Sequence, residues 1–326
     1  MTGTRERPNA TLTRFLQAWY FPPMTPMDAA CLRASPAQHP ASEIDMARQD
    51  TTDLRPYFNA PWYAATYGAG KSWLVGRVAW FAYRRRGRRK GHSPCALFDA
   101  AWYLAHNCDV RASGLDPLAH YVTHGWHEGR KPCPLFDPTW YRARYPEVDA
   151  GGYEPLLHYL SMGWRQGASP HPAFDPACYL ARHPDVDAAS LEPLGHYLAY
   201  GWREGRNPHP LFDVRWYLDR NPDVARAGVE PLGHYLTTGW REGREVSPWF
   251  ASERYAALGR PRRAEPNPFV RFLIEEYEPV AADVVRRATV VAKVMPLRNS
   301  AATTHPAAAF LRWPADHRVA VAVAST

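Results

Sequence analysis

The sequence lacks the features by which exported, membrane-spanning and disulfide-linked chains are recognised. No stretch reaches the ~18 uncharged apolar residues that a transmembrane helix needs, and residues 1–30 lack the basic start and apolar core of a signal peptide. The five cysteines are odd in number, scattered and without a CxxC pair. We therefore expect a cytoplasmic protein with reduced thiols, and neither a disulfide framework nor a zinc knuckle.

Proline and tryptophan are abundant instead, with 32 and 13 among 326 residues, which points to a repeated sequence unit. The unit is visible in phenylalanines that recur every 38 residues without an insertion. These are Phe98, Phe136, Phe174, Phe212 and Phe250. Four complete units therefore fill residues 98–249, and each has a Trp-Tyr or related pair, a His-Tyr pair and a Gly-Trp pair at the same positions.

The flanking segments depart from this unit. Residues 58–97 form an altered first repeat, in which the spacing to the next phenylalanine is 40. Residues 250–285 form a degenerate repeat of the kind that caps an exposed core. We expect residues 1–57 to be a mostly irregular leader, and residues 286–326 to be a tail with short strand-like stretches, standing where an α/β domain would begin.

Each complete unit predicts two short helices joined by a turn. An aspartate follows each phenylalanine and suits a helix N-cap, as Asp213 does. The second helix begins at an acidic residue followed by proline, such as Glu192, and ends at the glycine of the Gly-Trp pair, such as Gly201. Helices of roughly 8 to 10 residues are too short to be stable alone in water, so they must stack on neighbouring units. The predicted fold class is all-α, a solenoid-like array of helix-turn-helix repeats.

Two sets of repeated side chains resemble binding sites. Histidine is the usual transition-metal ligand, but packed helices lie ~8 to 10 Å apart, too far for histidines of successive units to share an ion. We expect each imidazole to bond a turn or backbone group of a neighbouring unit. The tryptophans are expected in the core, with stacking on sugar rings as the alternative if they are exposed. The two sets are His120, His158, His196, His234 and Trp126, Trp164, Trp202, Trp240.

Asp185-Val186-Asp187 is similar to the two-carboxylate motif by which many sugar-nucleotide transferases hold a divalent cation. An equivalent unit has Asp223-Val224-Ala225, so the first acid belongs to the repeated turn and the second is incidental. We therefore expect no metal and no cofactor, and we name no catalytic residue.

Most of the positive charge lies in one short segment. Residues 58–97 hold eight basic residues and no acidic one, whereas residues 98–249 hold 14 basic and 19 acidic residues. Six cations follow an aromatic-rich stretch that includes Trp80, a pattern typical of a helix at an anionic membrane surface. The alternative is a repeat helix with a solvated basic loop, and the acidic units argue against nucleic acid. The cations are Arg84, Arg85, Arg86, Arg88, Arg89 and Lys90.

The units also resemble a known family. Residues 212–224, Phe-Asp-Val-Arg-Trp-Tyr-Leu-Asp-Arg-Asn-Pro-Asp-Val, and residues 231–244, Pro-Leu-Gly-His-Tyr-Leu-Thr-Thr-Gly-Trp-Arg-Glu-Gly-Arg, are similar to repeats found beside glycosyltransferase and rhamnan-synthesis domains in large bacterial polysaccharide-biosynthesis proteins. Similar units occur in some secreted calcium-binding repeat proteins. The resemblance is closest across residues 98–249, and it carries no catalytic residue, because in those proteins the chemistry lies in the neighbouring domain.

This resemblance implies a non-catalytic helical-repeat scaffold or accessory module that serves a glycosyltransferase, or another polysaccharide-assembly protein, in making a bacterial surface polysaccharide. The expected location is the cytoplasm, peripheral at the inner face of the cytoplasmic membrane. One alternative is a truncated glycosyltransferase whose catalytic domain is missing. Another is a carbohydrate-binding repeat module.

Overall fold

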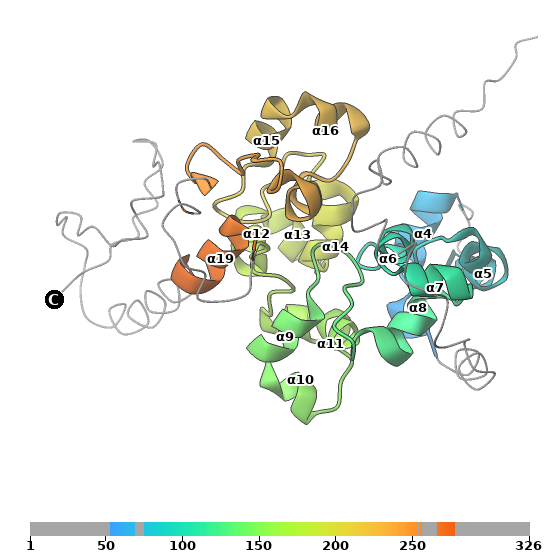
Figure 1. Ribbon diagram of the computed structural model, residues 1–326. Coiled ribbons are helices and arrows are strands. Elements are labelled where there is room, and N and C mark those ends of the chain that lie inside the picture. Colours follow the sequence, from blue (N-terminus) through green and yellow to red (C-terminus); the bar gives the residue numbers. More distant parts are fainter. Residues whose placement is uncertain (1–52, 69–74, 253–254, 256–265, 278–326) are drawn as a thin grey trace, which may run out of the picture.

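The computed structural model describes residues 53–68, 75–252, 255 and 266–277. Across these residues the fold is an all-α array of repeats, which confirms the predicted fold class. Figure 1 shows the units following one another from the altered first repeat, in blue and cyan, to helix α19 (Pro268–Phe272), in orange. The predicted leader up to residue 52 and the predicted strand-like tail lie outside the described residues.

Each complete unit contains three helical segments instead of the two predicted. The first unit has α6 (Ala100–His106), α7 (Cys108–Ser113) and α8 (Pro117–His120), and α8 continues into the π-helical turn η4 (Tyr121–Gly125). The second has α9 (Pro138–Arg144), α10 (Pro146–Ala150), α11 (Pro155–Ser161) and η5 (Gly163–Gln166). The third has α12 (Pro176–Arg182), α13 (Pro184–Ala188), α14 (Pro193–His196) and η6 (Tyr197–Gly201). The fourth has α15 (Val214–Arg220), α16 (Pro222–Ala227), α17 (Pro231–His234) and η7 (Tyr235–Gly239).

The extra helix in each unit replaces the predicted turn. In α13 and its counterparts α10 and α16, proline occupies the first helical position and an acid follows it. Proline is also favoured at the start of a helix, where its missing N–H is not needed, and an acid there interacts favourably with the helix dipole. The valine that comes next, such as Val186, is buried and ties the short helix to the core. Proline followed by an acidic residue is therefore as favourable at the start of a helix as it is in a turn.

The predicted N-caps of the longer helices are confirmed. Asp213 accepts a hydrogen bond from the Trp216 N–H at 3.0 Å, and Asp99, Asp137 and Asp175 cap their helices in the same way. Glu192 caps α14 by accepting from the Leu194 N–H at 2.8 Å. These caps satisfy backbone donors that such short helices would otherwise leave unpaired.

The glycine of the Gly-Trp pair ends the helical segment as predicted in the first, third and fourth units, whereas in the second unit α11 ends at Ser161 and Gly163 begins η5. Gly201 closes η6, and the chain stays right-handed at Trp202, with φ −64° and ψ −33°. A Cβ added at Gly201 would lie 2.2 Å from the hydroxyl oxygen of Tyr179, so the glycine leaves room for that hydroxyl. The chain turns four residues later at Gly205, whose φ of +72° is the left-handed conformation that favours glycine.

An aromatic trio forms the core of each unit. In the third unit Phe174 contacts Tyr179 and Tyr197, with ring centroids 5.5 and 5.8 Å apart, and each of the three residues is at most 1% exposed. Such tilted aromatic pairs stabilise a core beyond the area that they bury. Equivalent trios form around Phe98, Phe136 and Phe212. The phenylalanines that mark the 38-residue period are therefore core residues.

The array coils so tightly that units touch beyond their nearest neighbours. A Cβ added at Gly195 would lie 3.1 Å from the side chain of Leu97, and one at Gly233 would lie 3.2 Å from Leu135, in each case more than two units earlier. The last described segment, η8 (Leu273–Tyr277), lies against the third unit through a ring contact of 5.0 Å between Tyr277 and His209. The buried side chains consequently form one core that runs through the complete units.

The altered first repeat keeps the aromatic trio but not the helix pattern. Its elements are α4 (Ala60–Tyr67), α5 (Val75–Ala82), the π-helical turn η2 (Tyr83–Gly87) and η3 (Arg88–Lys90). The helical turn η1 (Arg55–Tyr57) precedes this repeat and corrects the predicted irregular leader at its end, because Tyr57 is buried in the main core and its hydroxyl donates to Glu154 at 2.8 Å. Phe58, Tyr63 and Tyr83 stand where the trio stands elsewhere, and they form a small cluster of their own. In the part of the chain that the structure describes, no helix is both long enough and apolar enough to cross a membrane.

Candidate functional site

The repeated histidines are bonded inside their own units. The Nδ1 atom of His196 lies 2.9 Å from the hydroxyl oxygen of Tyr179, which projects from the first helix of the same unit. The distance is also 2.9 Å in the other three units, between Tyr103 and His120, Tyr141 and His158, and Tyr217 and His234. The expected bond to a neighbouring unit is thus wrong: the imidazole joins the first and last helices of a single unit.

Burial fixes the protonation of this pair. It lowers the pKa of His196 and of the three equivalent histidines, because a charged imidazole loses solvation there. It raises the pKa of Tyr179, so that tyrosine keeps its proton. The hydrogen bond therefore joins a neutral imidazole to a neutral hydroxyl. Gly201 leaves room for the Tyr179 hydroxyl. The glycine, tyrosine and histidine therefore pack together in the same way in each complete unit.

A second repeated bond joins successive units. Tyr159 in the second unit donates to the carboxylate of Glu192 in the third, at 2.5 Å, and Tyr197 donates to Glu230 at 2.5 Å. The same glutamates cap the helices that follow them. Enclosure of the carboxyl raises the pKa of Glu192 to about 7. These acids are therefore part of the interface between units, although each also has the raised pKa that is often found at a catalytic acid.

The tryptophan column lies in the core, as expected. Trp164 and Trp202 are only 9% and 7% exposed, and Trp126 and Trp240 are half-buried. Arginine covers the rings: the guanidinium of Arg203 lies 4.2 Å from the Trp202 ring centroid, and similar contacts occur at the other three. Sugar stacking needs an open aromatic face, so this column offers little to a glycan.

Asp185 is engaged by the repeat. Arg206 contacts both of its carboxylate oxygens, at 2.9 and 2.8 Å, and this hydrogen bonding lowers the pKa of Asp185. The equivalent pair in the fourth unit is Arg244 with Asp223. The first acid of the Asp-Val-Asp motif is thus an ion-pair partner in the repeat. Among the described residues, no three side chains of His, Cys, Asp or Glu come together in a way that could hold a metal ion.

The basic run forms an exposed surface next to exposed apolar side chains. Arg84, Arg85, Arg86, Arg89 and Lys90 are exposed in η2 and η3. On the preceding helix α5, Val78 and Phe81 are 47% and 58% exposed. We call these seven residues the basic face. The Arg85 guanidinium lies 5.3 Å from the Phe81 ring centroid, so charge and apolar surface are contiguous there.

Two residues predicted for this surface are turned inward. Trp80 is half-buried and packs on Phe58 and Tyr83, with ring centroids 5.2 and 5.8 Å apart. Arg88 forms an ion pair with Asp116 of the first complete unit at 2.8 Å, and these side chains are only 20% and 10% exposed. Both residues therefore attach the basic segment to the array and do not belong to its outer surface.

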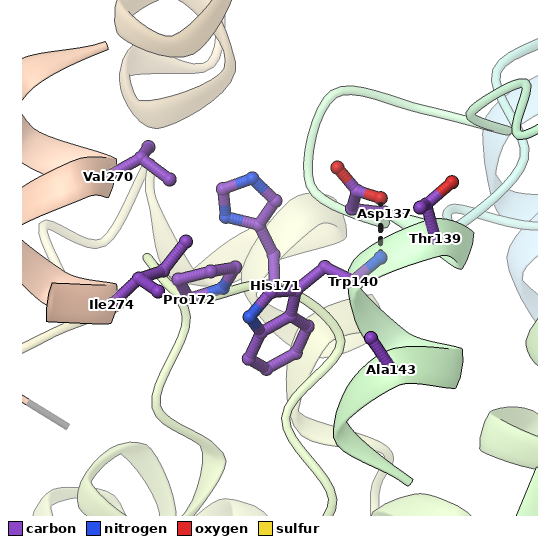
Figure 2. A pocket seen from close by; sticks show the side chains of 8 residues that line it. All are labelled: Asp137, Thr139, Trp140, Ala143, His171, Pro172, Val270 and Ile274. Atoms are coloured by element: carbon purple, nitrogen blue, oxygen red, sulfur yellow. Dashed lines mark hydrogen bonds between the residues drawn. The ribbon is translucent and has the colours of Figure 1, made fainter. Parts of the chain in front are cut away.

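An open cleft of about 260 Å³ lies between α9 and the C-terminal helix α19. Figure 2 shows Trp140 and Thr139 on one side and Val270 and Ile274 on the other. Its carboxylate is already occupied, because Asp137 accepts from the Trp140 N–H at 2.9 Å and pairs with Lys131 at 2.7 Å. His171, also in the lining, is buried and accepts from the Ala173 N–H. The cleft is thus a seam between the second unit and the cap.

Sequence reasoning included Val78 and Phe81 in the aromatic-rich stretch without predicting which of its residues are exposed, and it missed the Tyr–Glu bonds between units. The helical period carries a signal for the first pair: positions 78, 81 and 85 follow one another at steps of three and four, which places them on one helix face. The Tyr–Glu bonds have a weaker signal, since only the constant offset of 33 residues between donor and acceptor marks them.

The chain matches no protein-family model, no curated protein and no solved structure.

Proposed function

We propose that this chain is a non-catalytic helical-repeat scaffold that serves a glycosyltransferase in bacterial surface-polysaccharide assembly, peripherally at the inner face of the cytoplasmic membrane. The observation that carries the scaffold role is the internal use of the repeated polar side chains. Histidine bonds tyrosine within each unit, as at His196, and glutamate bonds tyrosine between units, as at Glu192. Histidine and glutamate are residue types well suited to catalysis, and here these side chains form structural hydrogen bonds with tyrosines instead.

The polysaccharide context is supported by the resemblance of the units to repeats that accompany glycosyltransferase and rhamnan-synthesis domains. In such proteins the repeats stand beside the catalytic domain, and a repeat array presents an extended surface suited to holding a partner. The basic face supports the peripheral location, since exposed cations next to exposed Phe81 favour contact with an anionic membrane.

Two rival functions make different predictions. A carbohydrate-binding module would use the tryptophan column, but Trp164 and Trp202 are buried beneath arginines. A glycosyltransferase that acted through Asp185 would need a carboxylate free for a cation, and Arg206 contacts both oxygens of that carboxylate. The scaffold role accounts for both observations without a further assumption.

The test is a polymer-synthesis assay with membranes from a host strain that lacks the chain. Membranes receive labelled sugar nucleotide, with or without the purified protein, and polymer is measured alongside free sugar. We expect the protein to raise polymer yield with membranes and to leave sugar nucleotide unchanged by itself. Turnover by the purified protein that is lost in Asp185→Ala would overturn the proposal in favour of an enzyme. Polymer yield that is the same with and without the protein would refute the scaffold role.

A further inference from the structure

We propose that the basic face, Val78, Phe81, Arg84, Arg85, Arg86, Arg89 and Lys90, is a docking site for anionic phospholipid headgroups. The inference rests on the peripheral location in the proposed function, and it specifies which side chains touch the membrane and which lipid class they select. Phe81 and Val78 enter the boundary between headgroups and acyl chains, while the arginines and lysine neutralise lipid charge above them.

The arrangement of the two helical segments places both kinds of side chain on one surface. Val78, Phe81 and Arg85 follow one another along one side of α5 and η2, and the Arg85 guanidinium lies over the Phe81 ring. Arg89 donates to the Arg85 carbonyl at 2.8 Å, so the next turn continues the same surface. An apolar tip flanked by cations is the pattern expected of an interfacial helix.

The surface is fixed to the repeat array and does not depend on lipid for its shape. Arg88 pairs with Asp116, which also caps α8 by accepting from the Ala119 N–H at 2.8 Å. Behind the surface, Tyr83 is 1% exposed and packs against Trp80 and Tyr63. The backbone segment that carries the exposed cations is therefore held in place before contact, which lowers the entropic cost of binding.

The distribution of charge favours a membrane, and not a nucleic acid, as the partner of the basic face. The cations are confined to one short segment, whereas the four units that continue from it hold 14 basic and 19 acidic residues. A nucleic acid chain extending from the basic face would meet this acidic surface and be repelled. A flat anionic bilayer requires only a local patch. The exposed Phe81 and Val78 also gain from an apolar environment that a duplex backbone does not provide.

The experiment is co-sedimentation of the full chain with vesicles of phosphatidylcholine, alone or mixed with phosphatidylglycerol. We expect binding to the mixed vesicles only, weakening as salt is raised. Loss of a surface cation costs roughly fivefold in affinity, so the triple change Arg84→Gln, Arg85→Gln, Arg86→Gln should weaken binding by on the order of a hundredfold. The matched control changes three exposed arginines elsewhere, Arg111→Gln, Arg182→Gln and Arg226→Gln, and should bind as the wild type does.

Single variants distinguish a loss of membrane contact from a loss of folding stability. Phe81→Ser should reduce vesicle binding without changing the melting temperature, whereas Leu191→Ser, at a residue 46% exposed in the third unit, should change neither. Arg89→Gln should weaken vesicle binding alone, while Arg88→Gln should lower the melting temperature through loss of its ion pair.

Equal binding of the wild type and the Arg84–Arg86 triple variant would overturn the inference, as would stronger binding to a DNA duplex than to the mixed vesicles. The proposed function fails separately. If vesicles bind but polymer yield does not respond to the chain, the lipid site stands and the scaffold role falls. If polymer yield responds while vesicles do not bind, only the lipid site falls.

Discussion

A tyrosine hydroxyl in each complete unit occupies the space in which a side chain at the Gly-Trp glycine would begin. At Gly201 the distance from an added Cβ to the Tyr179 hydroxyl would be 2.2 Å, far inside van der Waals contact. That hydroxyl is held in place by His196 at 2.9 Å. Glycine, tyrosine and histidine therefore constrain one another, and a change in any of them affects the other two.

The substitution Gly201→Ala should destabilise the protein by about 1–3 kcal/mol, because the methyl group displaces the Tyr179 hydroxyl from His196. Urea unfolding followed by circular dichroism measures the loss. The double variant Gly201→Ala, Tyr179→Phe removes the clashing oxygen, so its loss should be smaller than the sum of the single losses. Additive losses would show that the clash is not the cause.

His209 should make the protein less stable in acid. It is 2% exposed, accepts from the Leu211 N–H, and burial lowers its pKa to about 3. In the unfolded chain histidine takes up a proton below its ordinary pKa of 6.5, whereas folded His209 stays neutral, so stability falls as pH drops from 6.5 toward 3. His209→Ser, which copies Ser247 at the equivalent position, should flatten this dependence.

The slope of unfolding free energy against pH is the measurement for His209, because His209→Ser also changes packing at every pH. Glu192, with its pKa raised to about 7, acts in the opposite direction: folded protein binds its proton first, so acidification from 7 toward the ordinary value of 4.5 adds stability. That contribution is present in both proteins and cancels in the comparison. An unchanged slope in His209→Ser would contradict the assignment.

The helices are short, and their caps and connections determine how they are held. Glu192 and Glu230, at the start of α14 and α17, each accept from backbone N–H groups of their own helix and from a tyrosine of the preceding unit, as Glu230 does from Leu232 and Tyr197. One carboxylate thus satisfies a helix terminus and joins two units. Secondary structure and packing between units are coupled through this single group.

Tyr197→Phe should weaken the contact between the third and fourth units by about 1.5–3 kcal/mol, the range for a hydrogen bond to a charged group. The matched control is Tyr235→Phe, since the hydroxyl of Tyr235 lies 3.5 Å from the Ser252 hydroxyl and bonds no carboxylate among the described residues. Midpoints of urea unfolding compare the two variants. Equal losses would mean that ring packing, not the bond to Glu230, responds to the change.

Sequence patterns predicted the helices well where one physical rule applied, and poorly where two competed. The aspartate and glutamate caps were correct because capping depends on local backbone donors alone. The Asn-Pro-Asp segment, such as 221–223, suits a turn and a helix start equally, and burial of Val224 decided in favour of a helix. The partner of His196 could not be predicted, since it depends on how α12 and α14 face each other.

The candidate surface shows the same limit. The cluster of cations was evident from residue order, but the ion pair that draws Arg88 toward Asp116 depends on tertiary structure. Trp80 was assigned to the outer surface because it is aromatic, while its position in the helix turns it toward Phe58. Phe81, one residue later, is exposed. Composition locates such a surface, and helix phase determines which of its residues face outward.

The whole molecule should unfold as one unit, because contacts link segments more than two units apart. Leu135 is 1% exposed and lies beside Gly233, so Leu135→Ala should cost about 2–5 kcal/mol and lower the stability of the entire array. Tryptophan fluorescence and circular dichroism should report the same urea midpoint in the wild type and in this variant. Two separated transitions would show that units unfold independently, as in an open solenoid.

The third unit has a Tyr–Glu bond on each side, because Glu192 accepts from the second unit and Tyr197 donates to the fourth. An in-frame duplication of the gene segment for one unit would therefore insert a module whose two sides already match those beside it. The uninterrupted 38-residue period is what repeated duplication of this kind leaves behind. Array length can then change between generations in whole units, by recombination between the DNA segments that encode similar units, without the evolution of a new interface.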